Sequence, residues 1–249
     1  MDVHTRSGRA APDIYDPAFV KGVFDRCSKK YITFSWLCSF GFTERWRRQC
    51  VEALPLRPSA DAKGYDLMAG TGEAWPHLIS AHPQIGGIVA VDISSGMHQL
   101  AIERLHHHRA HRIEFIEDDV LRSRLPAASA DFVISTFGLK TFNPGQHRQL
   151  AGLVAAALRA GGSFSMIEAS DPRGWLFRGL YLFHLNIVLP LVERLLLRGA
   201  KDFSMIGAYC ANFIDASEFA QMLRDEGLEV EFRRYFFGCA TGVSGRKPL

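Results

Sequence analysis

The clearest chemical signal in the chain is a glycine-containing turn followed, one predicted strand later, by an acidic residue. The run Asp66-Leu67-Met68-Ala69-Gly70-Thr71-Gly72-Glu73 ends a short apolar stretch and opens a predicted helix. Glycines let the backbone approach a ligand closely, and a helix N-terminus offers free N–H groups. Asp92 lies 20 residues beyond Gly72, at the end of the next apolar stretch. A carboxylate there can accept hydrogen bonds from both hydroxyls of a ribose.

The spacing favours a nucleoside ligand that lacks a pyrophosphate. The dinucleotide fingerprint G-x-G-x-x-G requires a small residue at position 75, where this chain has Trp75. Asp118-Asp119-Val120 follows a third predicted strand, where an acid can accept a hydrogen bond from an adenine amino group. Each piece alone is more often an ordinary turn, but their order and spacing agree with one another.

Strand-like and helical patterns alternate through the middle of the chain and must position these residues. The predicted strands are 65–69, 87–91, 112–116, 130–136 and 163–168, and the predicted helices between them are 73–81, 94–108 and 146–158. This alternation predicts right-handed β-α-β units and an open parallel sheet.

Helical patterns flank this core on both sides. On the N-terminal side, residues 17–54 are helical with a break at Ser39-Phe40-Gly41. On the C-terminal side, a long apolar stretch covers 175–198. It is followed by predicted helices near 203–213 and 217–226 and predicted strands at 228–236 and 239–244. We therefore expect an α/β fold with a doubly wound, mostly parallel seven-stranded sheet. The expected organisation is a flexible tail at 1–16 and one domain at 17–249, with a helical cover at 17–54 and a helical insertion at 173–227.

The ensemble of turn, strands and acids resembles the class I S-adenosylmethionine-dependent methyltransferase fold. The resemblance implies S-adenosyl-L-methionine as the cofactor, and no metal-binding residues are expected. The residues expected to bind the cofactor are Asp66, Gly70, Thr71, Gly72, Asp92, Ile93, Met97, Asp118, Asp119, Val120 and Thr136. Met68 departs from the glycine often found in this turn, at what we expect to be a packing position.

Further motifs resemble the ubiquinone/menaquinone biosynthesis C-methyltransferases over roughly residues 19–247. The matching segments are Tyr31…Ser39-x-Gly41…Trp46-Arg47, Phe137-Gly138-Leu139-Lys140, Glu168-Ala169-Ser170 and the spacing Tyr181…Pro190…Phe203-Ser204…Phe213. The resemblance implies transfer of a methyl group to a ring carbon of a lipid-tailed quinol. Deprotonation of a ring hydroxyl would load electron density onto that carbon, and alignment of the two reactants would supply much of the acceleration.

The departures from the family pattern fall on the presumed substrate side. Lys140 stands for the family's Arg, Thr141 for Asn, Ile32 for Asp, Tyr209 for Ser and Ile214 for Pro. They favour a different head group or a different reaction on a similar apolar ligand. One alternative is rhodoquinone biosynthesis, in which an amine replaces a ring methoxy group. Another is a cofactor-binding member of a quinone-synthesis complex that has lost its chemistry.

The expected catalytic residues are Lys140, Thr141 and Tyr209. Lys140 follows the fourth strand, where it is either a cation that stabilises a ring phenolate or a surface lysine. Tyr209 either hydrogen-bonds a ring oxygen or packs, Glu168 either orients the substrate loop or caps a turn, and His184 is more often a core histidine than a base. His106, His107, His108 and His111 lack nearby carboxylate or thiolate spacing, so a metal site there is not expected.

Composition narrows the function classes and the compartment. The net charge is +3 and Lys and Arg are scattered among acids, which argues against nucleic acid as a partner. The densest basic group, Arg45, Arg47 and Arg48, is expected on a solvated helix face. Five widely spaced cysteines and a polar start without a signal peptide favour reduced thiols in the cytoplasm.

The phenylalanines are distributed unevenly. Of 18, five lie at 19–42, none at 43–114 and nine at 164–237. We expect the two Phe-rich segments to meet over the cofactor and form an apolar pocket for a lipid-tailed quinone or another apolar aromatic substrate. The uncharged run 179–192 is too short to span a bilayer, and it suits either a peripheral contact with the inner membrane or the wall of a tail pocket.

Overall fold

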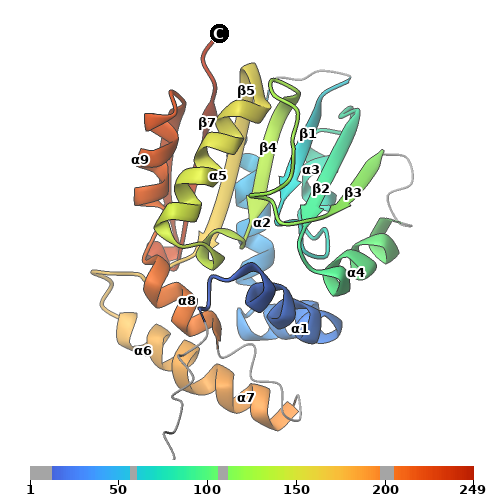
Figure 1. The fold of residues 1–249 in the computed structure, drawn as a ribbon. Helices are drawn as coiled ribbons and strands as arrows, with labels where there is room; N and C mark the ends of the chain where they lie inside the picture. Colours follow the sequence, from blue (N-terminus) through green and yellow to red (C-terminus); the bar gives the residue numbers. More distant parts are fainter. Residues whose placement is uncertain (1–12, 57–60, 106–111, 197–204) are drawn as a thin grey trace, which may run out of the picture.

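A seven-stranded sheet with the order β3-β2-β1-β4-β5-β7-β6 forms the centre of the molecule (Figure 1). The computed structural model describes residues 13–56, 61–105, 112–196 and 205–249. The strands are β1 (Lys63–Leu67), β2 (Gly87–Asp92), β3 (Ile113–Glu117), β4 (Ala130–Thr136), β5 (Leu158–Ala169), β6 (Glu229–Tyr235) and β7 (Ala240–Arg246). Neighbouring strands from β3 to β5 are parallel, and β7 runs antiparallel to both β5 and β6. The predicted mostly parallel, doubly wound sheet is confirmed.

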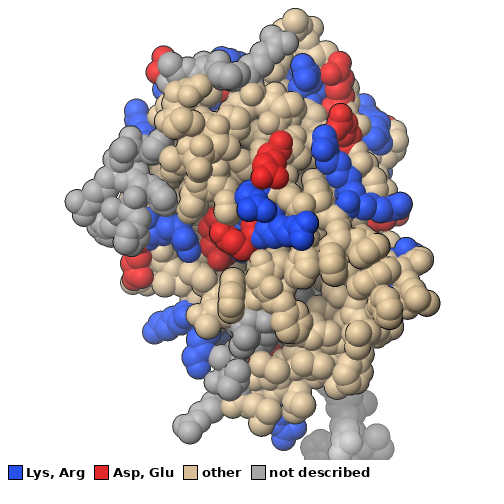
Figure 2. All heavy atoms as spheres, turned by 180° about the vertical axis from the view of Figure 1, so that it is seen from behind, with Lys and Arg blue, Asp and Glu red and all other residues tan. Residues whose placement is uncertain are grey.

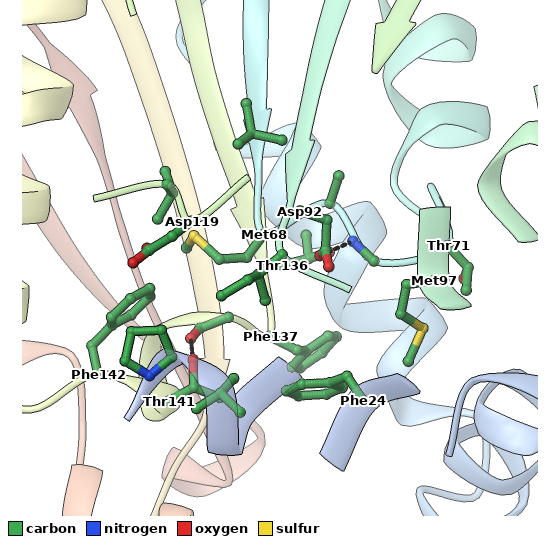
Figure 3. Close-up of a pocket in the computed structure, with 18 of the residues that line it drawn as sticks. Phe24, Met68, Thr71, Asp92, Met97, Asp119, Thr136, Phe137, Thr141 and Phe142 are labelled. Carbon is green, nitrogen blue, oxygen red and sulfur yellow. Dashed lines mark hydrogen bonds between the residues drawn. The ribbon is translucent and has the colours of Figure 1, made fainter. Parts of the chain in front are cut away.

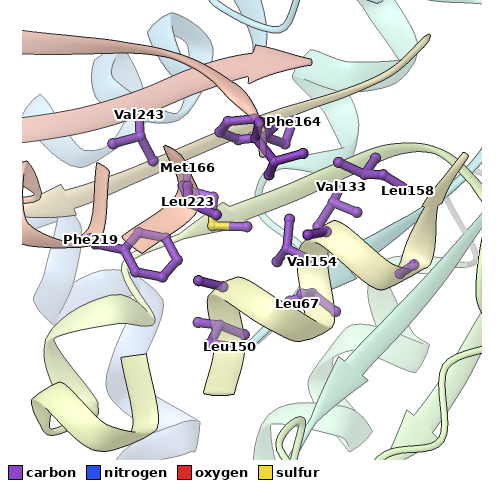
Figure 4. Close-up of a cluster of buried hydrophobic side chains, with 14 of the residues drawn as sticks. Leu67, Val133, Leu150, Val154, Leu158, Phe164, Met166, Phe219, Leu223 and Val243 are labelled. Carbon is purple, nitrogen blue, oxygen red and sulfur yellow. The ribbon is translucent and has the colours of Figure 1, made fainter. Parts of the chain in front are cut away.

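One face of the sheet is covered by α5 (Pro144–Ala157) and α9 (Ser217–Asp225). Figure 4 shows their side chains interleaved with those of the strands, with Leu150 and Phe219 meeting Leu67, Val133 and Phe164 in a fully buried cluster. Helix α5 starts with a capping box, in which Asn143 and Gln146 each accept a hydrogen bond from the other's backbone N–H at 2.9 Å.

The opposite face is covered by α2 (Phe42–Glu52) and α3 (Trp75–Ala81), with α4 (Ser95–Leu105) beside them. Phe132 and Ile134 point to this side while Val133 points to the other, as the period of a strand requires. Ser94 caps the N-terminus of α4 as predicted, since its hydroxyl accepts a hydrogen bond from the Met97 N–H at 3.1 Å.

The remaining helices lie beyond the carboxyl ends of the parallel strands (Figure 1). They are α1 (Pro17–Cys38), α6 (Arg178–Phe183), α7 (Leu189–Leu196) and α8 (Met205–Phe213). A π-helical segment, His184–Val188, joins α6 to α7, so Pro190 follows a widened turn instead of ending the helix. Within the described residues no helix combines the length and apolarity needed to cross a bilayer.

The two Phe-rich segments meet, as predicted. Val192 of α7 packs against the cluster formed by Cys27 of α1 and Met97, as do Phe24 and Tyr31 of α1. The Tyr209 hydroxyl of α8 donates a 2.7 Å hydrogen bond to the Ile14 carbonyl, just before α1. The break between α1 and α2 is also confirmed, because Phe40 and Gly41 have left-handed φ angles of 51° and 77°. Most of the expected tail, residues 1–12, lies outside the described residues, as do His106–His108 and His111.

Candidate functional site

A cavity opens at the carboxyl ends of β1, β2, β3 and β4, where open α/β sheets bind their ligands. Figure 3 shows side chains from these strand ends facing α1 across it. Most of the predicted cofactor residues line this cavity: Gly70, Thr71, Asp92, Ile93, Met97, Asp118, Asp119, Val120 and Thr136, together with Thr141. The sequence thus located the cavity from four separate strand ends.

Asp92 ends β2 and holds the glycine turn in place. One carboxylate oxygen accepts a hydrogen bond from the Gly70 N–H and the other from the Ser94 N–H, each at 2.8 Å. The turn carries positive φ angles at Met68, Gly70 and Gly72. The carboxylate therefore lies at the cavity wall with its orientation fixed by backbone donors, as a ribose-binding acid requires.

Asp66 and Gly72 do not line the cavity, although the sequence placed them with the cofactor-binding residues. Both contact Trp75 behind the turn. The indole N–H donates a 2.9 Å hydrogen bond to Asp66, whose side chain is 1% exposed. A Cβ on Gly72 would lie 2.4 Å from the Trp75 ring. In this structure these residues support the turn and do not form its ligand-facing surface.

Substituting each glycine of the turn should show which one supports the structure of the turn and which one faces the ligand. Gly72→Ala would add a methyl group that overlaps Trp75 at a left-handed φ of 71°, so we expect destabilisation by about 2–5 kcal/mol. A Cβ on Gly70 would meet nothing within 4 Å, so Gly70→Ala should cost only about 1–2 kcal/mol of strain while weakening ligand binding. Thermal unfolding and titration with S-adenosylhomocysteine measure the two effects. Equal stability losses would contradict this assignment.

Asp66 should make stability depend on pH. Burial raises its pKa from 3.8 to about 7, with the Asp92 charge acting in the same direction. The folded chain therefore keeps a proton that the unfolded chain releases, and the free energy of unfolding falls as pH rises between these values. Asp66→Asn should reduce this fall by about 2–3 kcal/mol, as measured by urea unfolding at pH 5 and pH 8 without ligand. The exposed Asp61→Asn variant is the control, and an unchanged slope in Asp66→Asn would refute the prediction.

Met68 occupies a packing position, as expected. It packs against the main core cluster and also lines the cavity, with a left-handed φ of 53°. Its side chain lies directly against Gly138, where a Cβ would come within 2.5 Å of the Met68 Cβ. Met68 thereby contacts the loop after β4 across the cavity floor. A glycine here would leave that floor open.

Sequence analysis missed the ion pair between Arg47 of α2 and Glu73. Arg47 was expected on a solvated face, and this was wrong: it is 4% exposed and lines the cavity, while Arg45 and Arg48 are exposed. Its Nη2 lies 2.5 Å from a Glu73 carboxylate oxygen, and its guanidinium lies 5.2 Å from the centre of the Phe137 ring. Its buried Nε has no hydrogen-bond partner among the described residues. The cavity therefore has a cationic donor available beside an anionic acceptor.

A second, more apolar cavity adjoins the first. Phe24, Tyr31 and Phe137 line both cavities, so these aromatic side chains lie where the two cavities meet. The other walls come from α1, α8 and the end of β5, and include Val23, Cys27, Ser35, Thr43, Lys140, Ala169, Met205 and Tyr209. This is the apolar pocket between cover and insertion that the phenylalanine distribution predicted.

Lys140 is buried at the wall of the second cavity and is not the surface lysine that was the alternative. It is 7% exposed, and its Nζ lies 2.7 Å from a carboxylate oxygen of Glu168, which is fully buried. Glu168 also accepts hydrogen bonds from the backbone N–H groups of Lys140 and Ala169, so it orients the loop after β4. The ammonium lies 5.8 Å from the Phe137 ring, on which Arg47 also lies.

The other expected substrate residues have defined positions. Thr141 lines the first cavity and donates its hydroxyl to the Gly138 carbonyl at 2.7 Å. Tyr209 lines the second cavity, but its hydroxyl donates to Ile14 and its ring packs edge-on against Tyr15. His184 is half-buried against Phe40. No group of three metal-ligating side chains occurs in the described part of the chain.

The sheet order, the glycine turn and the acid after β2 define a class I S-adenosylmethionine-dependent methyltransferase. Solved structures share this fold. Phosphoethanolamine N-methyltransferase 2 of Haemonchus contortus, in complex with S-adenosyl-L-methionine, has a TM-score of 0.60 at 13% identity and covers 91% of this chain and 60% of its own. Geranyl diphosphate C-methyltransferase of Streptomyces coelicolor has a TM-score of 0.58 at 11% identity over 82% of this chain and 77% of its own.

More specifically, the chain belongs to the ubiE/COQ5 methyltransferase family, whose profile matches residues 13–247. Demethylmenaquinone methyltransferases of Bacillus cereus and Bacillus anthracis are similar to it, at 24% identity over 230 residues that cover 92% of this chain and 95% of theirs. The chain is accordingly an S-adenosylmethionine-dependent methyltransferase, as the resemblance implied.

Proposed function

We propose that the enzyme transfers a methyl group from S-adenosyl-L-methionine to the ring of a lipid-tailed quinol. The observation that supports this most directly is the apolar second cavity, which shares Phe24, Tyr31 and Phe137 with the cofactor cavity. A planar ring bound where the two cavities meet, beside these shared aromatic side chains, would lie directly against the cofactor, as in-line transfer requires. The similarity to demethylmenaquinone methyltransferases points to the same substrate class.

The residues of the first cavity fit each part of the cofactor, whose sulfonium supplies the activated methyl group. Asp92 suits the ribose hydroxyls and Asp119 suits the adenine amino group. Arg47 has a free buried Nε, and its partner Glu73 is an acid on the same wall. We assign the cofactor's carboxylate to Arg47 and its ammonium to the neighbourhood of Glu73, because a zwitterion complements an ion pair of opposite charges.

Lys140 would act on the substrate. A quinol becomes a carbon nucleophile when a ring hydroxyl loses its proton, and an ammonium group near that oxygen stabilises the phenolate. Lys140 is held at the second cavity by Glu168 and the Phe137 carbonyl, at 2.7 and 3.1 Å. The lysine thus has a fixed direction before substrate binds, so little reorganisation is needed during the reaction.

The rhodoquinone alternative rests on the substituted substrate-side positions. Lys140 and Tyr209 both line the second cavity, whereas Ile32 of α1 is 37% exposed and lines a third hollow, which shares Arg47 with the first cavity and Thr43 with the second. An apolar residue at position 32 removes a carboxylate that the family pattern places there. This change fits a reaction with different proton requirements, such as replacement of a methoxy group by an amine.

Gene deletion combined with mass spectrometry of the host's quinones tests these functions. Accumulation of a demethylated quinone, and its conversion by the purified enzyme with S-adenosyl-L-methionine, would support methylation. Loss of an aminoquinone would support the rhodoquinone alternative. Cofactor binding without turnover on any quinol, and with an unchanged quinone profile, would contradict both and favour a non-catalytic member of a quinone-synthesis complex.

A further inference from the structure

The helical run from α6 through α7 is apolar on both sides. Its inner side packs against the protein, with Leu185 and Leu189 buried against Cys210. Its outer side carries a stripe of exposed side chains, Leu180, Phe183, Ile187, Leu191 and Leu195, which are 54–70% exposed. Spacings of three and four residues place these side chains on one helix face. A helix that is apolar all round is normally buried, so this outer face is unusual for a surface exposed to water.

Two aromatic corners extend this face. Phe237 is 69% exposed and stacks on Trp175, just before α6, with ring centres 5.3 Å apart. Phe40, at the α1–α2 break, is 77% exposed and lies 5.3 Å from the His184 ring. We define the apolar face as Phe40, Leu180, Phe183, Ile187, Leu191, Leu195 and Phe237. It therefore draws on three segments that are distant in sequence.

The exposed charges in the α6–α7 part of the apolar face are positive. Among the described residues of 172–213, the only acid is Glu193, which is 2% exposed, whereas Arg173, Arg178 and Arg194 are exposed. Arg173 and Arg178 share the single buried partner Asp171, so this group keeps a net positive charge. Figure 2 shows a largely uncharged lower part of the molecule, with charges of both signs gathered higher up. Exposed apolar groups beside cations complement an anionic lipid surface.

The second cavity lies next to this face. Ser35 and Thr43, which line that cavity, flank the corner that carries Phe40. We propose that the apolar face docks the enzyme on an anionic lipid bilayer, with the second cavity opening beside the membrane surface. The cavity's role in this arrangement rests on the proposed function, because a lipid-tailed quinol would then enter it from the bilayer. The docking itself depends only on the face.

Vesicle co-sedimentation of the full chain tests the docking. We expect the chain to sediment with phosphatidylcholine–phosphatidylglycerol vesicles more than with pure phosphatidylcholine vesicles. The triple variant Leu180→Gln/Ile187→Gln/Leu191→Gln should lower the partition coefficient about tenfold or more, because each side chain loses apolar contact with the acyl region. The double variant Ile102→Gln/Ile116→Gln is the matched control, since both side chains are exposed, by 42% and 38%, outside the face.

Two outcomes would overturn the proposal. One is equal vesicle binding by the wild type and the triple variant. The other is a wild-type protein that binds neither kind of vesicle, whether the free protein is a monomer or a dimer formed through this face. S-adenosylhomocysteine affinity and methylation of a short-tailed quinol in solution report on the proposed function separately. The triple variant should retain both, which also confirms that it is folded.

Discussion

Arg47→Gln should weaken binding of S-adenosylhomocysteine about 10- to 100-fold and leave binding of 5′-methylthioadenosine nearly unchanged. The second ligand lacks the amino-acid end, so it cannot gain from a carboxylate contact. A charge-assisted hydrogen bond from a buried guanidinium contributes about 1.5–3 kcal/mol, which corresponds to this range of affinity. Isothermal titration of both ligands against the wild type and the variant measures the difference directly, without any assumption about the methyl acceptor.

The ion pair with Glu73 must be separated from this effect. Arg47→Gln leaves the Glu73 carboxylate, 12% exposed, without its 2.5 Å partner, and that cost falls on the free protein and on both complexes. The double variant Arg47→Gln/Glu73→Gln removes the unpaired charge and should recover stability but not S-adenosylhomocysteine affinity. Arg48→Gln, at an exposed position on the same helix, should change neither. If Arg47→Gln lowers the affinity for both ligands equally, Arg47 supports the cavity wall and does not bind the cofactor's carboxylate.

The inward turn of Arg47 shows where the sequence alone was insufficient. Three arginines around Trp46 predict a solvated face, yet Arg47 shares helical spacing with the buried Cys50, Val51 and Leu54. That spacing was a signal available in the sequence. The partner was not, because Glu73 lies 26 residues away and meets Arg47 only through the packing of α2 beside α3.

Asp66 and Asp92 show that the position of the cofactor cavity could be predicted from the sequence, but not which acids face into it. Strand ends and the residues that follow them are set by local patterns, and parallel strands bring their carboxyl ends to one edge, so most of the cofactor cavity could be predicted. Which acids face the ligand depends on side-chain partners. Asp66 turned away because Trp75, read in the sequence only as a bar to a pyrophosphate, supplies a donor behind the turn.

Lys140→Ala should lower both stability and turnover, for different reasons. The substitution leaves Glu168 fully buried without a cation, and breaking a buried ion pair from one side costs about 3–5 kcal/mol. It also removes the ammonium beside the substrate cavity, and loss of one such group lowers kcat about 10²- to 10³-fold. Urea unfolding and single-turnover methylation of a quinol measure the two losses.

The double variant Lys140→Met/Glu168→Gln separates these losses. It replaces the charges with neutral groups of similar size, and such replacements of buried pairs are often neutral for stability, so the chain should fold nearly as well as the wild type. Turnover should remain low, because methionine cannot stabilise a phenolate. Lys140→Arg keeps the cation at the same position and should recover more turnover than the double variant. Wild-type turnover in a stable double variant would show that Lys140 and Glu168 only hold the loop after β4, and the ring oxygen would need another partner in the second cavity.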